Sequence, residues 1–303
     1  MSRRPATGGH LARALSLVQR TPRPVLDAVA ALGGWEQAWL PTAGVQQWQR
    51  TVTTMTGVRP GRAATARAVR SWARNLSESA QLSSWTPQRI VERVEISPEH
   101  RELLLSCHRE TGAVVALPHL GSWDHAGAWA CLEGMPVSSV AEQLPPADFD
   151  FFAVARSALG MRIYPHRDPR VIERLIDDSR AGRLVCLLAD RNFSRNGVEV
   201  DWPTARGPRQ VRMPGGPVQV ALATGAALLP ATTYYTGRRL HIDIWEPVTA
   251  PAGPGQVGEM CQRLADVFAR EIARRPYDWH VLQPFFVEDL PERYRRPSSG
   301  EGV

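Results

Sequence analysis

From Gly112 onward the chain alternates short apolar runs with helix-like segments, and this alternation is the strongest constraint on its fold. The apolar runs have the length of buried strands and lie at 113–118, 137–140, 161–165 and 184–189. The segments between them have helical character and lie at 123–133, 148–159 and 168–180. Such alternation is typical of a parallel sheet covered by helices. We therefore predict an α/β fold whose central sheet is mixed but mainly parallel and is flanked by helices.

The later segments extend this pattern. A polar stretch at 191–216 is rich in Gly, Pro and Arg, and we expect it to be a long connection of the kind that usually carries function. The segments at 218–224 and 256–275 indicate helices, and 228–245 indicates two strands around a turn at Thr236-Gly237. Polar residues follow Pro291. We expect one domain over 1–290 and a mobile tail over 291–303.

The chain before Gly112 has a different character. It lacks strand-like runs, so we predict that residues 1–110 form a helical part preceding an α/β core at 111–290. The segments 22–40 and 63–82 carry apolar side chains at helical spacing. Half of the ten Trp residues lie in this part: Trp35, Trp39, Trp48, Trp72 and Trp85. Two interpretations stay open, namely packing between helices and an apolar surface for lipid chains or a membrane.

Every basic residue of the chain is Arg, and the formal net charge is +6. The lack of Lys excludes a Walker A phosphate loop and a Schiff-base enzyme. The arginines are scattered, and no finger-like or RNP-like signature is present, so we expect no nucleic-acid partner. A basic surface also suits an anionic membrane. Since no window is long and apolar enough to span a bilayer, membrane contact would be peripheral.

The cysteines and histidines point to neither disulfides nor a metal. The four cysteines are widely spaced, form no CxxC pair and lie in apolar surroundings, which is typical of thiols in a reducing compartment. The histidines away from position 119 show no metal-ligand spacing. We therefore expect no metal site.

His119 is the candidate catalytic residue. It directly follows the apolar run 113–118, and ligands of α/β sheets bind beyond the carboxyl ends of the strands. Asp124 follows across a strand-to-helix turn, where its carboxylate could select the imidazole tautomer and stabilise the imidazolium. A single His and Asp at this spacing arise often by chance, so this pair needs support from elsewhere in the chain.

That support comes from a series of segments. His119-Leu-Gly-Ser-Trp-Asp124 and Ala126-Gly-Ala-Trp129 resemble the first block of the lysophospholipid-acyltransferase-like superfamily. The resemblance continues in the same order through these segments: Ala141-Glu142-Gln143, Phe151-Phe152 with Arg156, Leu188-Ala-Asp190-Arg-Asn192, Gly197-Val-Glu-Val-Asp201, Arg212-Met-Pro-Gly-Gly-Pro217 and Pro276-Tyr-Asp-Trp-His280. The most similar branch contains the lipid A acyltransferases and the actinobacterial phosphatidylinositol mannoside acyltransferases, and the second group is the closer one. Ser122 and Trp202-Pro-Thr depart from the family pattern, where Asn and an aromatic pair with Gly are usual.

The resemblance implies an O-acyltransferase that needs no cofactor and uses acyl-CoA as co-substrate. Its acceptor would be a mannose hydroxyl of a phosphatidylinositol mannoside, at the cytoplasmic face of the plasma membrane. His119 would be the general base, with Asp124 or Glu199 orienting its ring. The implied substrate-binding residues are Glu142, Arg156, Asp190, Arg191, Arg209 and Arg212, since arginine pairs readily with phosphate.

Two alternatives remain open. One is a related acyltransferase with another lipid or glycolipid acceptor, such as a lipid A-like molecule or a secondary metabolite. The other is a non-catalytic lipid-binding protein of the same fold. The oligomeric state and the choice between coenzyme A and a carrier protein as donor also stay open.

Overall fold

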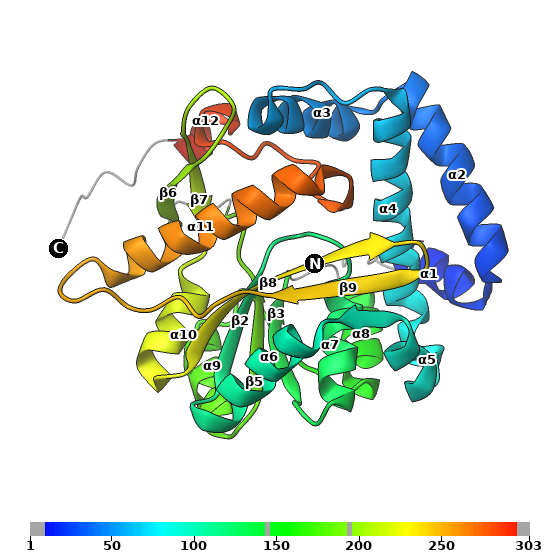
Figure 1. The fold of residues 1–303 in the computed structure, drawn as a ribbon. Coiled ribbons are helices and arrows are strands. Elements are labelled where there is room, and N and C mark those ends of the chain that lie inside the picture. The colour runs from blue at the N-terminus through cyan, green and yellow to red at the C-terminus, as the bar shows by residue number, and fades with distance from the viewer. Residues whose placement is uncertain (1–9, 143–145, 193–195, 296–303) are drawn as a thin grey trace, which may run out of the picture.

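The computed structural model describes residues 10–142, 146–192 and 196–295, and a seven-stranded sheet lies at its centre (Figure 1). The order of the strands is β1-β9-β8-β2-β5-β3-β4. Their bounds are β1 Val94–Ile96, β2 Ala113–Leu117, β3 Val137–Ala141, β4 Arg162–Pro165, β5 Leu184–Leu188, β8 Ala227–Thr236 and β9 Arg239–Ile244. Every neighbouring pair is parallel except β8 and β9, which form an antiparallel hairpin. The predicted α/β fold with a mixed, mainly parallel sheet is confirmed.

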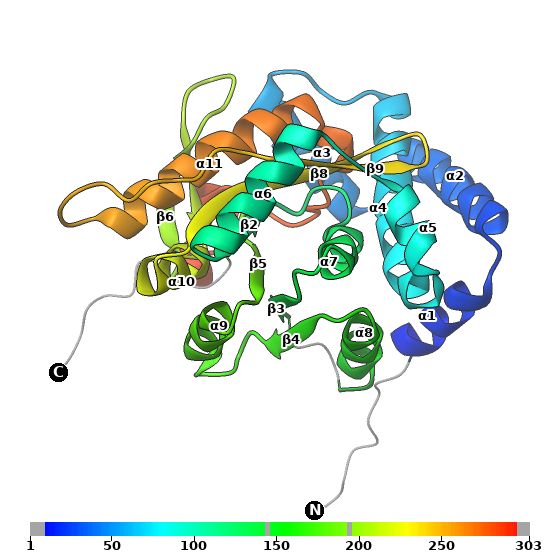
Figure 2. The same cartoon turned by 60° about the horizontal axis from the view of Figure 1, so that its bottom comes forward.

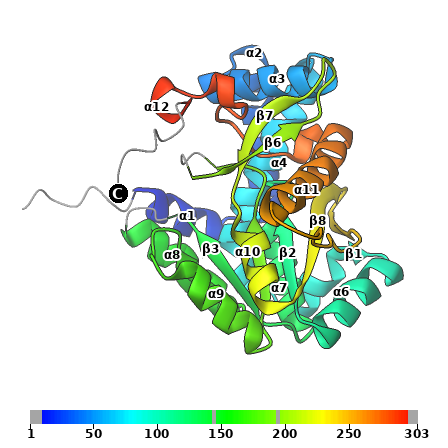
Figure 3. The same cartoon turned by 90° about the vertical axis from the view of Figure 1, so that its left-hand side faces the viewer.

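Helices cover both faces of the sheet (Figures 2 and 3). Strand β2 illustrates this, because successive side chains point to opposite faces of the sheet and all five residues are buried. Val114 and Ala116 belong to a core that includes side chains of α9 (Val171–Arg180), α10 (Gly216–Thr224) and α11 (Gln256–Arg274). Val115 and Leu117 belong to the opposite core, against α6 (Pro98–Glu110) and α7 (Trp123–Leu132). A strand buried on both faces has no polar side, which explains its continuous apolar run.

The N-terminal part is mainly helical, as predicted, and lies beside one edge of the core (Figure 1). Its helices are α1 His10–Arg20, α2 Arg23–Trp39, α3 Ala43–Thr56, α4 Arg62–Gln81 and α5 Pro87–Glu92. Helices α2 and α4 approach closely at Gly34, where an added Cβ would lie 2.8 Å from the Ala66 carbonyl oxygen. The expectation that this part contains no strand is wrong, because β1 pairs in parallel with β9 at the sheet edge.

Some tryptophans of the N-terminal part pack inside the protein, and others lie on its surface. Trp48 and Trp85 are buried in the two cores, whereas Trp35, Trp39 and Trp72 are exposed. Helix α2 also presents Val25, Val29 and Leu32 to solvent, on the side opposite Gly34. Among the described residues, no helix combines the length and apolarity that crossing a bilayer requires.

The prediction of a long connection over 191–216 is wrong. This stretch contains an antiparallel hairpin of β6 (Val198–Trp202) and β7 (Arg209–Met213). Trp202, Val211 and Met213 are buried beneath it, and the Gln262 side chain on α11 accepts from the Asp201 N–H (2.8 Å) and donates to its carbonyl (2.7 Å). Of the tail expected over 291–303, Glu292–Arg295 form helix α12, and the residues after 295 lie outside the described part.

Candidate active site

The loop that carries His119 is held by two other parts of the chain. The His119 N–H donates to Oδ2 of Asp190 (3.1 Å), and its carbonyl accepts from the His280 N–H (2.8 Å). The Gly121 N–H donates to the carbonyl of Asp278 (2.8 Å). These backbone contacts fix the position of the imidazole at the carboxyl end of β2, where the sequence placed it.

Gly121 is required at its position by backbone geometry. Its φ is +64°, a conformation that side chains disfavour, and an added Cβ would lie 2.5 Å from both the carbonyl oxygen and Oγ1 of Thr233. The Thr233 hydroxyl donates to the Leu120 carbonyl (2.5 Å) and accepts from the Ser122 N–H (3.1 Å). The N–H groups of Gly121 and Ser122 are thus engaged within the protein, which leaves neither of them to stabilise an oxyanion.

The carboxylate that contacts the His119 ring belongs to Asp190. Its Oδ1 lies 2.5 Å from Nδ1 of His119, and its Oδ2 accepts from Nε1 of Trp279 (2.9 Å). Burial alone would raise the pKa of Asp190, but the charge and hydrogen bond of His119 and the Trp279 bond lower it below its ordinary value of 3.8. An ionised Asp190 accepts a hydrogen bond from a protonated Nδ1 of His119, which leaves the lone pair of the ring on Nε2.

The expectation that Asp124 or Glu199 orients this ring is therefore wrong. Asp190 lies two residues beyond the end of β5, the strand beside β2, and Leu117 and Leu188 are partners in the parallel register. Residues that follow partnered strand ends reach the same edge of the sheet, so the two side chains meet there. Asp190 was expected to bind substrate, and the structure places it behind the imidazole, fully buried.

Asp124 has a different partner. Its two carboxylate oxygens accept from Nε (2.7 Å) and Nη2 (3.0 Å) of Arg156, a bidentate pair that links α7 to α8 (Pro146–Ala158). Burial lowers the pKa of Arg156, but the charge and hydrogen bond of Asp124 raise it above its ordinary value. The guanidinium also lies 5.3 Å from the centre of the Phe152 ring. This pair fixes one wall of the site.

A cavity of about 390 Å³ extends from His119 into the core between the sheet and α7. Its polar side chains gather at His119, Asp124, Glu142 and Arg156, and Trp123 packs edge-on against the imidazole with ring centres 5.5 Å apart. The rest of the lining is mostly apolar and includes Leu76, Val115, Leu117, Ala130, Met161 and Ile163. A single ionisable cluster at the end of a deep apolar space is suited to a ligand with a polar reactive group and a long hydrocarbon chain.

Residues 12–287 match the family model described as bacterial lipid A biosynthesis acyltransferase. The chain belongs to this family of acyltransferases.

Three curated relatives are similar to this acyltransferase, and each is named phosphatidylinositol mannoside acyltransferase. Two are from Mycobacterium tuberculosis. The protein of strain CDC 1551 / Oshkosh is 34% identical over 266 residues, which is 83% of this chain and 80% of that protein. The protein of strain H37Rv is 39% identical over 215 residues, which is 68% of this chain and 64% of that protein. The protein from Mycolicibacterium smegmatis is 33% identical over 294 residues, which is 92% of this chain and 91% of that protein.

Within the described part of the acyltransferase, three other candidate residues lie on the β6–β7 hairpin and do not line the cavity beside His119. Glu199 is half exposed and accepts from Nε of Arg212 (2.9 Å), the residue opposite it in the hairpin. Arg212 is buried and also donates to the Tyr294 carbonyl. Arg209 pairs with Glu288 and lies over the Phe286 ring. Glu199 and Arg212 link the two strands of the hairpin, and Arg212 and Arg209 connect the hairpin to the C-terminal segment.

Arg191 lies beside the acyltransferase site without lining the cavity. Burial lowers the pKa of Arg191 below its ordinary value, and the charges of Asp190 and Glu142 offset only part of this effect. It therefore supplies positive charge close to both carboxylates, one behind the imidazole and the other at the cavity.

The side chains of Ser122 and His280 contact other protein groups and do not line the cavity at His119. The Ser122 side chain is fully buried and accepts from the His125 N–H (3.4 Å), so it caps helix α7. Nε2 of His280 lies 3.2 Å from the Ser71 hydroxyl, which donates to Asp278 (2.5 Å). Burial and the nearby charge of His119 lower the pKa of His280 to about 3, so this ring is neutral.

Proposed function

We propose that this acyltransferase moves a fatty acyl group from acyl-CoA to a mannose hydroxyl of a phosphatidylinositol mannoside, with His119 as general base. The observation that carries the proposal is the imidazole held by Asp190 through Nδ1 while its ring lines a deep apolar cavity. The names of the mycobacterial relatives support the choice of acceptor.

The reaction follows from this geometry. Nε2 of His119 takes the proton from the acceptor hydroxyl as its oxygen attacks the thioester carbonyl. The tetrahedral intermediate collapses to the ester and expels the coenzyme A thiolate, to which the imidazolium returns the proton. The buried carboxylate of Asp190 stabilises the imidazolium in between. Because a thiolate leaves readily, the protein contributes mainly by positioning the two substrates.

The cavity suits the acyl chain. Its lining beyond the polar cluster is mostly apolar, so a hydrocarbon chain buried there leaves water at a gain of about 25 cal/mol per Å² of apolar surface. The thioester would then lie where the apolar lining meets His119, Asp124 and Glu142. Arg156 is held by Asp124, so its role is to fix the wall, and Glu142 is the exposed acid that remains to contact sugar hydroxyls.

The membrane contact belongs to helix α2. Val25, Val29 and Leu32 are each at least half exposed and recur at helical spacing on the side of α2 opposite Gly34. Trp39 is equally exposed at the end of the helix, with the Arg62 guanidinium over its ring. An apolar stripe of this kind favours the interface of a bilayer, and the net charge of +6 favours an anionic one. We place the enzyme peripherally on the cytoplasmic face of the plasma membrane.

The test combines donor cleavage with an acceptor panel. Palmitoyl-CoA is incubated with purified phosphatidylinositol mannoside, a lysophospholipid or lipid A, and release of free thiol and formation of acylated lipid are both followed. We expect thiol release that requires the mannoside, loss of this release in His119→Ala, and no change in the exposed control His166→Ala. Thiol release with another lipid alone would refute the mannoside acceptor. No release with any acceptor would indicate a non-catalytic lipid-binding protein.

A further inference from the structure

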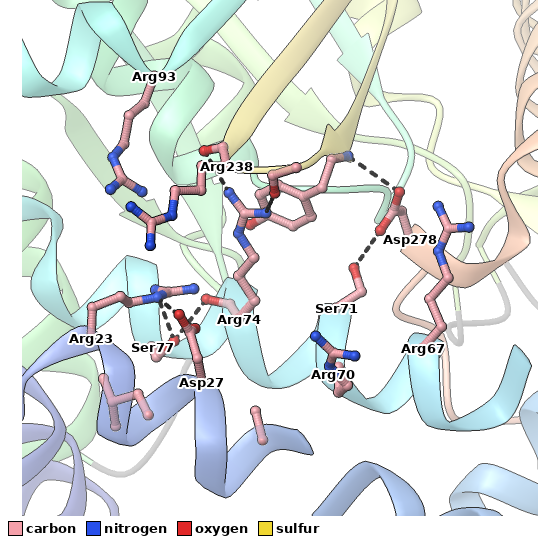
Figure 4. Close-up of a pocket in the computed structure, with 14 residues that line it drawn as sticks. Arg23, Asp27, Arg67, Arg70, Ser71, Arg74, Ser77, Arg93, Arg238 and Asp278 are labelled. Atoms are coloured by element: carbon pink, nitrogen blue, oxygen red, sulfur yellow. Dashed lines mark hydrogen bonds and ion pairs between the residues drawn. The ribbon is translucent and has the colours of Figure 1, made fainter. Parts of the chain in front are cut away.

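A second cavity, of about 440 Å³, lies between helices α2 and α4 and the turn of the β8–β9 hairpin (Figure 4). Figure 4 shows arginine side chains from several parts of the chain around one space. The arginines that line it are Arg23, Arg67, Arg70, Arg74, Arg93 and Arg238. We call this space the arginine cavity. It is separate from the cavity at His119, and the reaction proposed above makes no use of its arginines.

Two of these arginines are neutralised by acids. Arg23 pairs with Asp27 through Nε (2.9 Å), and Arg74 pairs with the buried Glu78 (2.8 Å). Glu78 also accepts from the Tyr235 hydroxyl (3.0 Å), and Arg74 lies 3.7 Å from the centre of the Tyr235 ring. These contacts hold the side chains of Arg74 and Tyr235 in place at the edge of the cavity.

The other four guanidinium groups are not neutralised in this way. In the part of the chain that the structure describes, Arg67, Arg70, Arg93 and Arg238 form no ion pair within 4.0 Å. Arg67 stacks on Tyr277 and Arg93 on Trp85, while Arg70 and Arg238 have no ring contact among the described residues. The third nearby acid, Asp278, is buried and already accepts from the Ser71 hydroxyl and the Tyr235 N–H.

The cavity therefore has an excess of positive charge. Against its six arginines stand three carboxylates, those of Asp27 and Asp278 in the lining and that of the buried Glu78 paired with Arg74, so three positive charges have no counterpart. Guanidinium groups that converge on one space repel one another, and a phosphate relieves this repulsion while accepting bidentate hydrogen bonds. We propose that the arginine cavity binds the phosphate groups of a ligand that carries more than one negative charge.

The arginine cavity is connected to the loop of His119 by a short series of contacts. Ser71 and Asp278 line it, and the Ser71 hydroxyl is 3.2 Å from His280, whose N–H donates to the carbonyl of His119. The phosphate groups could come from two sources, the 3′-phosphate and diphosphate of coenzyme A or the headgroup of an anionic phospholipid. The first source rests on the proposed acyl-CoA donor, and the second rests only on contact with a bilayer.

The test measures binding without turnover, so its result is independent of catalysis. Binding of adenosine 3′,5′-bisphosphate is measured by calorimetry, and binding to phosphatidylcholine vesicles with and without phosphatidylinositol is measured by sedimentation. The variant is the pair Arg70→Gln and Arg238→Gln, which removes two charges and no ring stacking. The matched control is the pair Arg109→Gln and Arg167→Gln, which removes two exposed charges remote from the cavity lining. Thermal unfolding verifies that both proteins fold.

We expect the cavity variant to lose at least about tenfold in affinity for one of the two probes, while the control stays near wild type. Loss confined to the bisphosphate identifies coenzyme A as the source, and loss confined to phosphatidylinositol vesicles identifies the lipid headgroup. The inference is overturned if the cavity variant binds both probes as wild type does. It is equally overturned if the control pair loses as much affinity as the cavity pair, since net charge alone would then explain the binding.

Discussion

Nδ1 of His119 lies 2.5 Å from Oδ1 of Asp190, although 71 residues separate the two in the chain. The second oxygen of the same carboxylate accepts from the His119 backbone and from the indole of Trp279. Asp190 therefore holds both the ring and its backbone, and it does so while fully buried. The acid of the His119-to-Asp124 motif has another task, since it binds Arg156.

Asp190→Asn is expected to lower kcat by about 10²- to 10⁴-fold, because an amide neither selects the reactive tautomer nor stabilises the imidazolium. Glu199→Gln, on the β6–β7 hairpin, should lower kcat far less. Steady-state kinetics with palmitoyl-CoA compare the two. If Glu199→Gln were the more damaging change, the assignment of Asp190 would fail.

The Asp190→Asn variant also tests the direction in which folding shifts the pKa of Asp190. A carboxylate whose pKa is lowered by folding adds stability above its ordinary pKa of 3.8, and this stability is lost as the pH falls through the lower folded value. The free-energy difference between wild type and Asp190→Asn should therefore shrink as the pH falls below about 3.8. Urea unfolding across this interval measures it, and a difference that grows toward acid pH would contradict the direction of the shift.

Asp124→Asn and Arg156→Gln are each expected to lower the free energy of unfolding by about 3 kcal/mol, because each leaves a buried group without its partner. The double variant should cost less than the sum of the two singles, since no uncompensated charge remains. A double-mutant cycle by urea denaturation gives the coupling. Additive losses would show that the pair contributes nothing as a pair.

His280 should make the protein less stable in mild acid. Its folded pKa is about 3 against an ordinary 6.5, so the unfolded chain binds the proton more readily between these values. The stability from the neutral ring is complete above about pH 6.5 and falls as the pH drops toward 3. His280→Gln should flatten this dependence in urea titrations. An unchanged slope would show that other groups cause the acid sensitivity.

Ala130→Leu is expected to shift the donor preference toward shorter chains. Ala130 lines the apolar cavity and lies about 10 Å along α7 from Trp123, at the rise of about 1.5 Å per residue. The added methyl groups should lower kcat/KM for palmitoyl-CoA relative to decanoyl-CoA by about tenfold. The control is Ala128→Leu, which is equally buried on the same helix but does not line the cavity. The same shift in both variants would argue against this placement of the acyl chain.

The sequence predicted the place of His119 in the fold, because a buried strand followed by a turn and a helix is a local pattern. The partner of His119 could not be found in this way. Strand β5 pairs with β2 even though β3 and β4 come between them in the chain, so Asp190 meets His119 only through the strand order. Asp124, near in sequence, was the natural but wrong candidate.

Strand β1 and both strands of the β6–β7 hairpin were missed for related reasons. Strand β1 is three residues long and half buried, and only its pairing with β9 makes it a strand. The β6–β7 hairpin is surrounded by Gly, Pro and Arg residues, which are typical of a loop. Its alternation of buried and exposed side chains is recognised only from the burial of Trp202 and Val211. In both cases the stabilising contacts come from distant parts of the chain.

The contacts that Asp278, Trp279 and His280 make with the loop at positions 119–121 have a consequence for biosynthesis. A growing polypeptide on the ribosome carries His119 and Asp190 long before the segment that locks them together has been translated. The nascent chain is therefore unable to assemble this arrangement of His119 and Asp190 until residues 278–280 have been translated.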